Sequence, residues 1–122
     1  MATVFADTGK AILTNRIKGS GTEPKFIGWG TGVGTAAEAD TTLFSESAET
    51  RATGTSTREE TNVPNDTYQV VGTLVATAAR AITNAGLFDA VSSGNLFLKG
   101  NFATINLETN DSIQFTIKAV FA

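Results

Sequence analysis

The clearest pattern in this chain is an alternation of apolar and polar residues at its C-terminal end. The apolar positions are Ile113, Phe115, Ile117, Ala119 and Phe121, and the residues between them are Ser112, Gln114, Thr116 and Lys118. Because successive side chains of a β-strand point to opposite faces, this pattern predicts a strand that buries one face against a core. A final element of this kind also ties the C-terminus into a sheet.

A β-hairpin is predicted around Pro64-Asn65-Asp66, whose residues favour a tight reversal of the chain. Two Thr-rich extended runs, at about 51–63 and 67–77, flank this turn. The second run has apolar residues on both faces, which favours a central strand. The first run carries charged residues, which are typical of an edge strand protected against unwanted pairing. These residues are Arg51, Arg58, Glu59 and Glu60.

A second hairpin is predicted further along the chain. Its parts are a broken strand at 81–83 and 85–88, a turn at 92–95 and a returning strand at 96–102. Ile105 and Leu107 then bridge to another turn at 109–111, just before the C-terminal strand. The turns follow one another at intervals that suit a small antiparallel β protein.

A short strand and a long loop are predicted before these hairpins. Residues 25–30 are aromatic, β-branched or Gly, which favours a strand, whereas residues 31–39 are too rich in Gly and Ala to form a packed one. Leu43 and Phe44 form an isolated apolar pair that can pin this loop to the core. The polar segment 45–50 is expected to be exposed.

One amphipathic helix is predicted near the N-terminus, over about residues 5–18. Its apolar residues, Phe5, Ile12, Leu13 and Ile17, form one thin stripe. Asp7 or Thr8 can cap its start, Arg16 and Lys18 lie in the last turn, and Gly19-Ser20-Gly21 ends it. Because the stripe is thin, the helix needs a sheet or a neighbouring subunit to hold it.

Together these elements predict a mainly β protein with one short N-terminal helix. The chain has 122 residues, which suits a single domain spanning 1–122, with the sandwich at about 24–122. About six or seven strands would form a small antiparallel β-sandwich or open barrel of jelly-roll type. Hydrophobic residues make up 41%, which is enough for one modest core.

Composition excludes several kinds of chemistry. With no Cys and no His, the chain cannot form a disulfide, a thiol nucleophile, a Ser-His-Asp triad or a zinc finger. The formal net charge of -3 and the scattered basic residues argue against a nucleic-acid partner. No apolar run is long enough to span a membrane, and residues 1–10 lack the pattern of a signal peptide. We expect no catalytic, cofactor-binding or metal-ligating residue.

Four groups of residues invite a functional interpretation, and each has a structural alternative. Gly28, Gly30, Gly32 and Gly34 alternate strictly, which does not fit a phosphate-binding loop and instead clears one strand face for close packing. Glu59 and Glu60 are neighbours on a strand, so they point to opposite faces and cannot flank one glycosidic bond.

The other two groups are turn aspartates and single aromatic residues. Asp40, Asp66, Asp89 and Asp111 lie at predicted turns, where Asp normally accepts hydrogen bonds from its own backbone. An incidental cation site with backbone carbonyls is the alternative. Trp29 and Tyr68, the only Trp and Tyr, are expected to be core or interface anchors, with sugar stacking as the alternative.

Four segments of the chain resemble small virion proteins of tailed bacteriophages, most of all the capsid decoration, or cement, proteins. The segments are 21–32 (GTEPKFIGWGTG), 66–73 (DTYQVVGT), 82–89 (ITNAGLFD) and 110–115 (NDSIQF). They are structural turns and strands, and the resemblance runs from about residue 10 to 121. Where such proteins often have an acidic residue, this chain has Asn84, so an ion pair at that place is not carried over.

The resemblance implies a non-enzymatic protein that binds the outer surface of the phage head and stabilises it. Its expected partners are the major capsid protein and further copies of itself, with a trimer at three-fold positions. The expected location is the virion surface, after synthesis in the host bacterial cytoplasm. A tail, neck, fibre or baseplate component is the first alternative, and a carbohydrate-binding module belongs to another class. The interface residues are not identified by the sequence.

Overall fold

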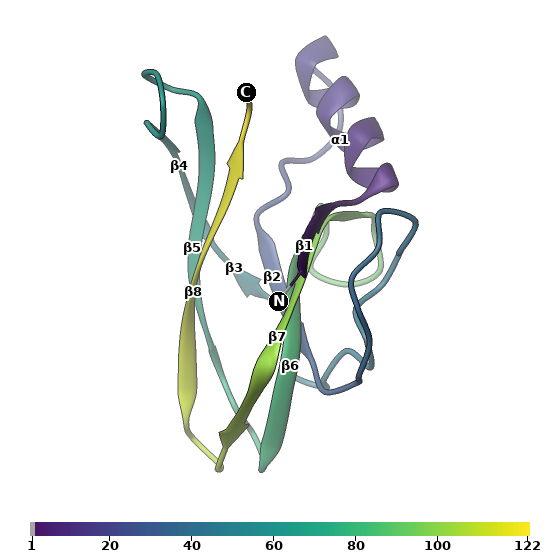
Figure 1. Ribbon diagram of the computed structural model, residues 1–122, viewed down its shortest axis with the longest axis vertical. Helices are drawn as coiled ribbons and strands as arrows, with labels where there is room; N and C mark the ends of the chain where they lie inside the picture. The colour runs from purple at the N-terminus through teal and green to yellow at the C-terminus, as the bar shows by residue number, and fades with distance from the viewer. Residues whose placement is uncertain (1) are drawn as a thin grey trace.

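The computed structural model describes residues 2–122, which form two antiparallel sheets and one helix (Figure 1). The elements are β1 (Ala2–Phe5), α1 (Asp7–Lys18), β2 (Phe26–Gly30), β3 (Ala52–Thr53), β4 (Thr55–Glu59), β5 (Thr67–Val75), β6 (Arg80–Phe88), β7 (Leu96–Leu107) and β8 (Ser112–Val120). The five-stranded sheet has the order β1-β7-β6-β2-β3, and the three-stranded sheet has the order β4-β5-β8. This architecture confirms the prediction of a small β-sandwich with one short helix.

The core lies between the two sheets. Its buried side chains come from the inward-facing positions of both sheets and from one residue of the helix, Ile12. The large ones are Ile27, Trp29, Val70, Leu74, Ile82, Leu87, Phe97 and Leu98. The ring of Phe115 on β8 meets the ring of Trp29 on β2 edge to face, with centroids 6.4 Å apart. This contact joins the two sheets.

The sandwich is closed by the backbone on one side only. Residues 52–59 pass from the five-stranded sheet to the three-stranded sheet at Gly54, whose N–H donates to the Lys25 carbonyl at 2.7 Å. A β-carbon at Gly54 would collide with Val70, so the crossing needs a residue without a side chain. On the opposite side, the edges are β1 and β8, which belong to different sheets and do not pair with each other.

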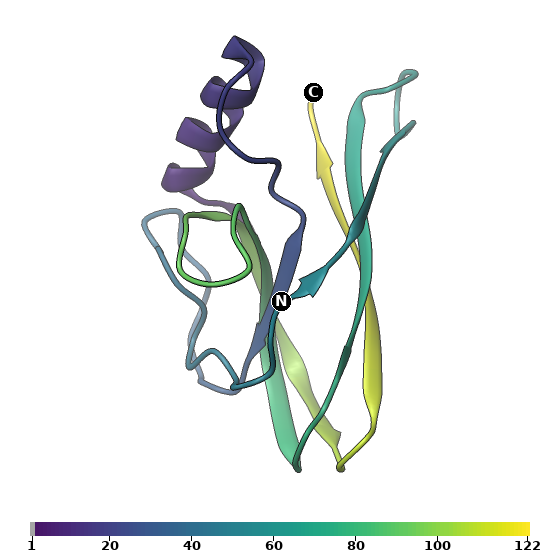
Figure 2. The ribbon, with the colours of Figure 1, turned by 180° about the vertical axis from the view of Figure 1, so that it is seen from behind.

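Loops cover the outer face of the five-stranded sheet. Segments 31–51 and 89–95 lie on that side of the molecule, away from the three-stranded sheet (Figure 2). Beneath them lies a second apolar cluster, made of Ala6, Leu43, Phe88 and Leu96 with Phe26 against it. Leu43 therefore pins the loop as predicted. No helix in the described part of the chain is long and apolar enough to cross a membrane.

The N-terminal prediction was wrong at its start. The helix begins at Asp7, and Phe5 belongs to β1, where it lies opposite Leu98 on β7. Strand pairing is favoured here because β7 offers Phe5 both backbone hydrogen bonds and a ring contact with Phe97, whose ring centroid lies 5.0 Å from that of Phe5. The N-cap is Ala6, without a side-chain cap bond.

The end of the helix is as predicted, and the bonds made by the two candidate cap residues explain why the start has no side-chain cap. Gly19 adopts the left-handed conformation that ends the helix, with φ 88°. Thr8, one of the two candidate caps, instead donates its hydroxyl to the Leu96 carbonyl at 2.6 Å. Asp7, the other candidate, bonds Lys10 at 2.9 Å. Both side chains are thus engaged away from the backbone amides of the first turn.

Several strand limits and burial predictions also needed correction. Residues 105 and 107 are not a bridge, because β7 runs on to Leu107 opposite Arg80. At its C-terminal end the central strand β5 buries only its inner face, since Thr73 and Val75 on the outer face are exposed, whereas Thr67 at its start is buried. Phe121 lies beyond the end of β8 and is exposed. The strand count is eight because β1 was not predicted and because the run predicted as one strand at about 51–63 forms two, β3 and β4, in different sheets.

We expect Phe115→Ala to destabilise the fold and Gln114→Ala to leave it nearly unchanged. Phe115 faces the core but is only partly buried, so the loss should be about 2 to 3 kcal/mol, below the value of about 3 to 5 for a fully buried Phe. Gln114 is exposed on the opposite face, so its change should stay within about 0.5 kcal/mol. Denaturant unfolding of both variants measures the difference, and equal losses would show that the register of β8 is wrong.

Candidate interaction surface

The four turn aspartates accept hydrogen bonds from their own turns, as predicted. Asp40 accepts from the Ala37 amide at 2.9 Å, Asp89 from the Asn95 amide at 2.7 Å, and Asp111 from the Glu108 amide at 2.8 Å. Asp66 accepts from three amides, those of Thr61, Asn62 and Val63, at 2.8 to 3.1 Å. These amide bonds hold the pKa of Asp66 well below its ordinary value. Each aspartate thus fixes a turn.

Glu49 is a buried carboxylate that the sequence did not reveal. Its segment, 45–50, was expected to be exposed, yet the Glu49 side chain is 4% exposed. It accepts from the Trp29 indole at 3.0 Å, from the amide and hydroxyl of Thr77 at 3.0 and 2.7 Å, and from Arg80 Nε at 3.0 Å. Burial raises the pKa of Glu49, but these donors outweigh it and the net pKa is low. The carboxylate ties the loop to β2 and β6.

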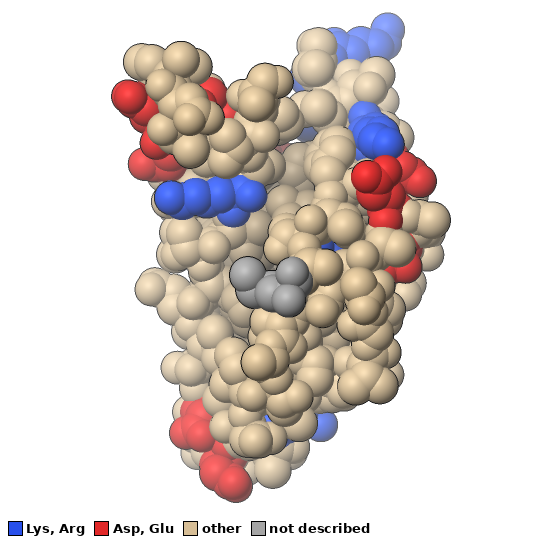
Figure 3. All heavy atoms as spheres, in the orientation of Figure 1, with Lys and Arg blue, Asp and Glu red and all other residues tan. Residues whose placement is uncertain are grey.

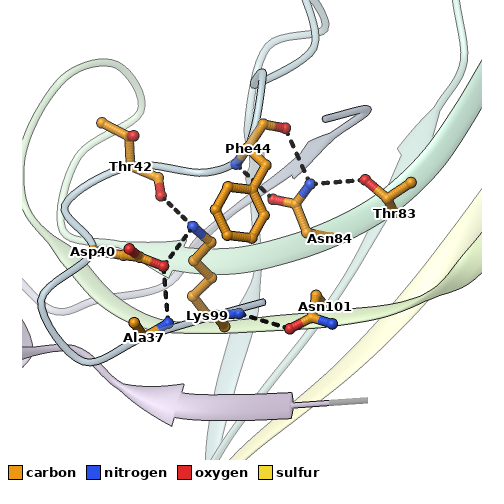
Figure 4. Close-up of polar contacts among 9 residues, drawn as sticks. Ala37, Asp40, Thr42, Phe44, Thr83, Asn84, Lys99 and Asn101 are labelled. Atoms are coloured by element: carbon orange, nitrogen blue, oxygen red, sulfur yellow. Dashed lines mark hydrogen bonds and ion pairs between the residues drawn. The ribbon is translucent and has the colours of Figure 1, made fainter. Parts of the chain in front are cut away.

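Lys99 is the buried cation that anchors the covering loop (Figure 4). Its side chain on β7 is 1% exposed, and its ammonium donates to Asp40 Oδ2 at 2.9 Å and to the Thr42 carbonyl at 2.8 Å. The Phe44 ring centroid lies 3.3 Å from the same nitrogen, a cation–π contact. Because the ammonium has a carboxylate, a carbonyl and a ring around it, its burial is compensated.

Asn84 completes this anchor from the neighbouring strand. Its amide group accepts from the Phe44 amide at 3.0 Å and donates to the Phe44 carbonyl at 3.1 Å (Figure 4). The Asn84 side-chain nitrogen also donates to the Thr83 hydroxyl at 3.1 Å. A carboxylate at this position could accept from the Phe44 amide but could not donate to its carbonyl. Asn84 therefore suits a role as a backbone clamp.

Arg51 was predicted to protect a strand edge, but it is buried. Its guanidinium forms a two-pronged ion pair with Glu46, Nε at 2.8 Å and Nη2 at 2.9 Å. The remaining nitrogen donates to the Ala90 and Ser93 carbonyls at 2.9 and 2.7 Å. The Phe88 ring centroid lies 3.4 Å from the guanidinium carbon. Arg51 thus joins the two covering loops, which explains why the charge is not at the edge.

The alternating glycines do clear a face for close packing. A β-carbon at Gly28 would lie 2.8 Å from Glu46 Oε2, and one at Gly32 would lie 2.8 Å from the Phe44 carbonyl carbon. At Gly30 the same addition would collide with the Phe44 carbonyl oxygen. The covering loop therefore occupies the space that a phosphate would need. This confirms the structural interpretation of the glycine run.

The remaining candidate residues are also placed by the structure. Glu59 ends β4 and Glu60 follows it outside the strand. Trp29 is 1% exposed, so it is a core anchor and is not available for stacking on a sugar. Tyr68 on β5 donates its hydroxyl to Glu23 Oε2 at 2.9 Å. Burial and the Glu23 carboxylate raise the pKa of Tyr68, so its hydroxyl stays protonated.

A cleft lies between α1 and the three-stranded sheet. It has a volume of about 420 Å³ and an apolar lining that includes Ile12, Leu13, Tyr68, Phe97 and Phe121. Arg16 and Arg58 also line this cleft, one on each side. The space-filling view shows a notch at the top of the molecule, between the part that contains α1 and the part that contains the three-stranded sheet (Figure 3). An extended segment with apolar and acidic side chains would complement this cleft.

A second hollow lies on the open side of the sandwich. It has a volume of about 280 Å³ and lies between β8 and the strands β1, β6 and β7. Its lining includes Phe102, Phe115 and Ile117. Within residues 2–122, no three acidic side chains gather where they could hold a metal ion. The surface features that can receive a partner are thus these two hollows and the strand edges beside them.

We expect the fold to lose stability on acidification because of Glu49 and Asp66. Both have a lower pKa in the folded chain than in the unfolded chain, so the unfolded state binds more protons. Their contribution is complete above about pH 5 and is lost as the pH falls through the ordinary carboxyl pKa of about 4 and below. Thermal unfolding between pH 7 and pH 3 measures this loss. In Glu49→Gln the Tm should be lower at pH 7 and the fall on acidification smaller, whereas Glu60→Gln should change neither.

We expect Lys99→Met to loosen the covering loop more than the whole fold. Methionine fills the space of the lysine stem but cannot bond Asp40 or the Thr42 carbonyl. Amide hydrogen exchange of Gly32 and Phe44 should accelerate about tenfold, which corresponds to about 1.4 kcal/mol of local stability. Lys118→Met, on the exposed face of β8, is the control. Unchanged exchange in Lys99→Met would mean that the loop is held without the ammonium.

Comparisons with known proteins leave function to be inferred from residues and geometry. A scan against protein-family models finds no matching family. Searches of curated proteins and of solved structures find no significant match either.

Proposed function

We propose that this chain is a non-enzymatic virion structural protein, a capsid decoration protein that binds the outer surface of a phage head and stabilises it. The observation that carries the proposal is where the four resembling segments lie. They contain or overlap β2, β5, β6 and the first half of β8, which together form the frame of the sandwich. Asp66, Asp89 and Asp111, which belong to these segments, each hold a turn. The segments that carry the resemblance are therefore parts of the structural framework of this fold.

The use of polar side chains supports a structural role. Four charged side chains form hydrogen bonds with the backbone of loops. They are Asp40, Glu49, Arg51 and Lys99. A protein built in this way offers a partner a firm shape and apolar contacts. Loops that are clamped beforehand lose little conformational entropy when a partner binds.

Within this proposal, the cleft between α1 and the three-stranded sheet is the surface that meets the shell. Phe121, which lines the cleft, is 46% exposed. Arg16 and Arg58 line the cleft together with one carboxylate, Glu23, so the charged side chains of its lining are positive by one unit in a chain that is acidic as a whole. An apolar segment with acidic residues on the shell protein is the complement of such a surface.

Stabilisation by such a protein follows from mass action. A protein that binds the expanded lattice and not the unexpanded one shifts the balance toward the expanded state. Many copies act together, so modest affinity per copy is sufficient. A role in bridging neighbouring capsomers requires at least two contact surfaces on each unit, whether on one chain or on an oligomer of it.

We expect phage particles that lack this protein to lose resistance to heat and to chelators, and purified protein to restore it. Phe121→Glu and Arg58→Glu should reduce binding to expanded heads at least tenfold with little change in Tm, because both residues line the cleft and are exposed. Val91→Glu, an equally drastic change at an exposed site outside the cleft, should bind normally. Cosedimentation with heads measures the binding.

Two outcomes would overturn parts of this proposal. Unchanged particle resistance, together with the protein found on the tail in a virion reconstruction, would replace the decoration role by that of a tail, neck or fibre component. Normal head binding by Phe121→Glu and Arg58→Glu would move the shell contact away from the cleft while leaving the decoration role in place.

A further inference from the structure

The β8 strand has the longest open edge in the described part of the chain. Its residues Ser112–Val120 pair with β5 along their whole length, and no other strand pairs with its outer side. The other edge strands are shorter: β1 has 4 residues, β3 has 2 and β4 has 5. A long edge offers a row of free backbone donors and acceptors that another strand can use.

The β8 edge also lacks the features that normally block pairing. It contains no Pro and no Gly, and Lys118 is its only charged residue. By contrast β4, at the other edge of the same sheet, carries Arg58 and Glu59. Three core-facing residues of β8, Ile113, Phe115 and Ile117, remain only partly buried. Phe115 and Ile117 also line the hollow of about 280 Å³ on the open side.

The sequence of β8 is complementary to itself in one antiparallel register. With a two-fold axis at Thr116, the inner face pairs Ile113 with Ala119 and Phe115 with Ile117, all apolar. The outer face pairs Ser112 with Val120, Gln114 with Lys118, and Thr116 with its own copy. No pair places like charges opposite each other, and aromatic and β-branched residues meet across the strands.

We propose that two copies of this chain pair through β8, antiparallel and with Thr116 on the two-fold axis, to form one continuous six-stranded sheet. The sheet order is β4-β5-β8-β8-β5-β4, which removes the longest open edge of both copies. The pairing would also cover the part of the hollow that adjoins Phe115 and Ile117. It keeps the self-association that accompanies the proposed function, replaces the expected trimer by a two-fold pair, and does not depend on capsid binding.

A single engineered cysteine tests this register directly, because the natural chain has no Cys. In the proposed pair, the two copies of residue 116 lie opposite each other with Cα atoms about 4.5 to 5.5 Å apart. That separation fits a disulfide, which needs about 4.4 to 6.8 Å. Thr116→Cys should therefore form a covalent dimer on mild oxidation. Thr116 is exposed on the outer face, so the substitution should not disturb the fold.

The matched control is Gln114→Cys, on the same strand and the same face. Its two copies would lie four residue steps apart, about 14 Å, which is too far for a disulfide. Non-reducing electrophoresis and sedimentation of the isolated chain are the measurements. Cross-linking of Thr116→Cys alone supports the proposal. A monomer at about 50 μM, a trimer without the cross-link, or equal cross-linking of both variants would overturn it.

Charge changes on the same face provide a readout without oxidation. Thr116→Lys places two ammonium groups opposite each other and should weaken the dimer at least tenfold. Thr73→Lys adds the same charge to the exposed face of β5, away from the axis, and should not. Gln114→Glu faces Lys118 of the second copy and should tighten the dimer at low salt. If Thr116→Lys pairs as tightly as the natural chain, this inference falls, and the decoration role, which head binding tests separately, is not affected.

Discussion

The outer half of this fold depends on how closely the covering loop approaches the five-stranded sheet. A sheet face covered by a loop leaves the loop's backbone groups out of water, and each must find a partner. Gly28, Gly30 and Gly32 remove the side chains that would hold the loop away. Asn84 can then bond both the amide and the carbonyl of Phe44. Without the glycines, the clamp and the cluster around Leu43 could not form.

The same constraint explains why so many charged residues are buried in a chain with few of them. Charged residues are 17% of the sequence, yet Arg51, Lys99 and Glu49 are all taken inside. Lys99 and Glu49 each tie the covering loop to strands, and Arg51 joins the two covering loops to each other, so the loops are held at several separate points. The cost of burying a charge is offset only where such partners are complete. The loops become fixed parts of the surface.

Much of the sandwich could be predicted because strands and turns leave local signals. The alternation at 112–121, the turn at 64–66 and the aspartates that hold turns each report on a few neighbouring residues. Strand β1 gave no such signal, because its pairing depends on the edge of β7, about a hundred residues away in sequence. Glu49 and Arg51 looked like surface residues because their partners, such as Thr77 and Ala90, lie far along the chain. The cleft likewise forms only in the folded chain, where α1 and the three-stranded sheet line it from its two sides.

The unequal sides of the sandwich connect the fold to assembly. On one side the chain itself crosses between the sheets at Gly54, so that side is closed by covalent structure. On the other side β1 and β8 end their sheets separately, and the core residues behind them stay partly exposed. The core of a small domain like this one covers a limited share of its own apolar surface. The proposed pairing through β8 would supply cover for this side from a second copy of the chain, which is how the unequal sides of the sandwich would be used in an assembly.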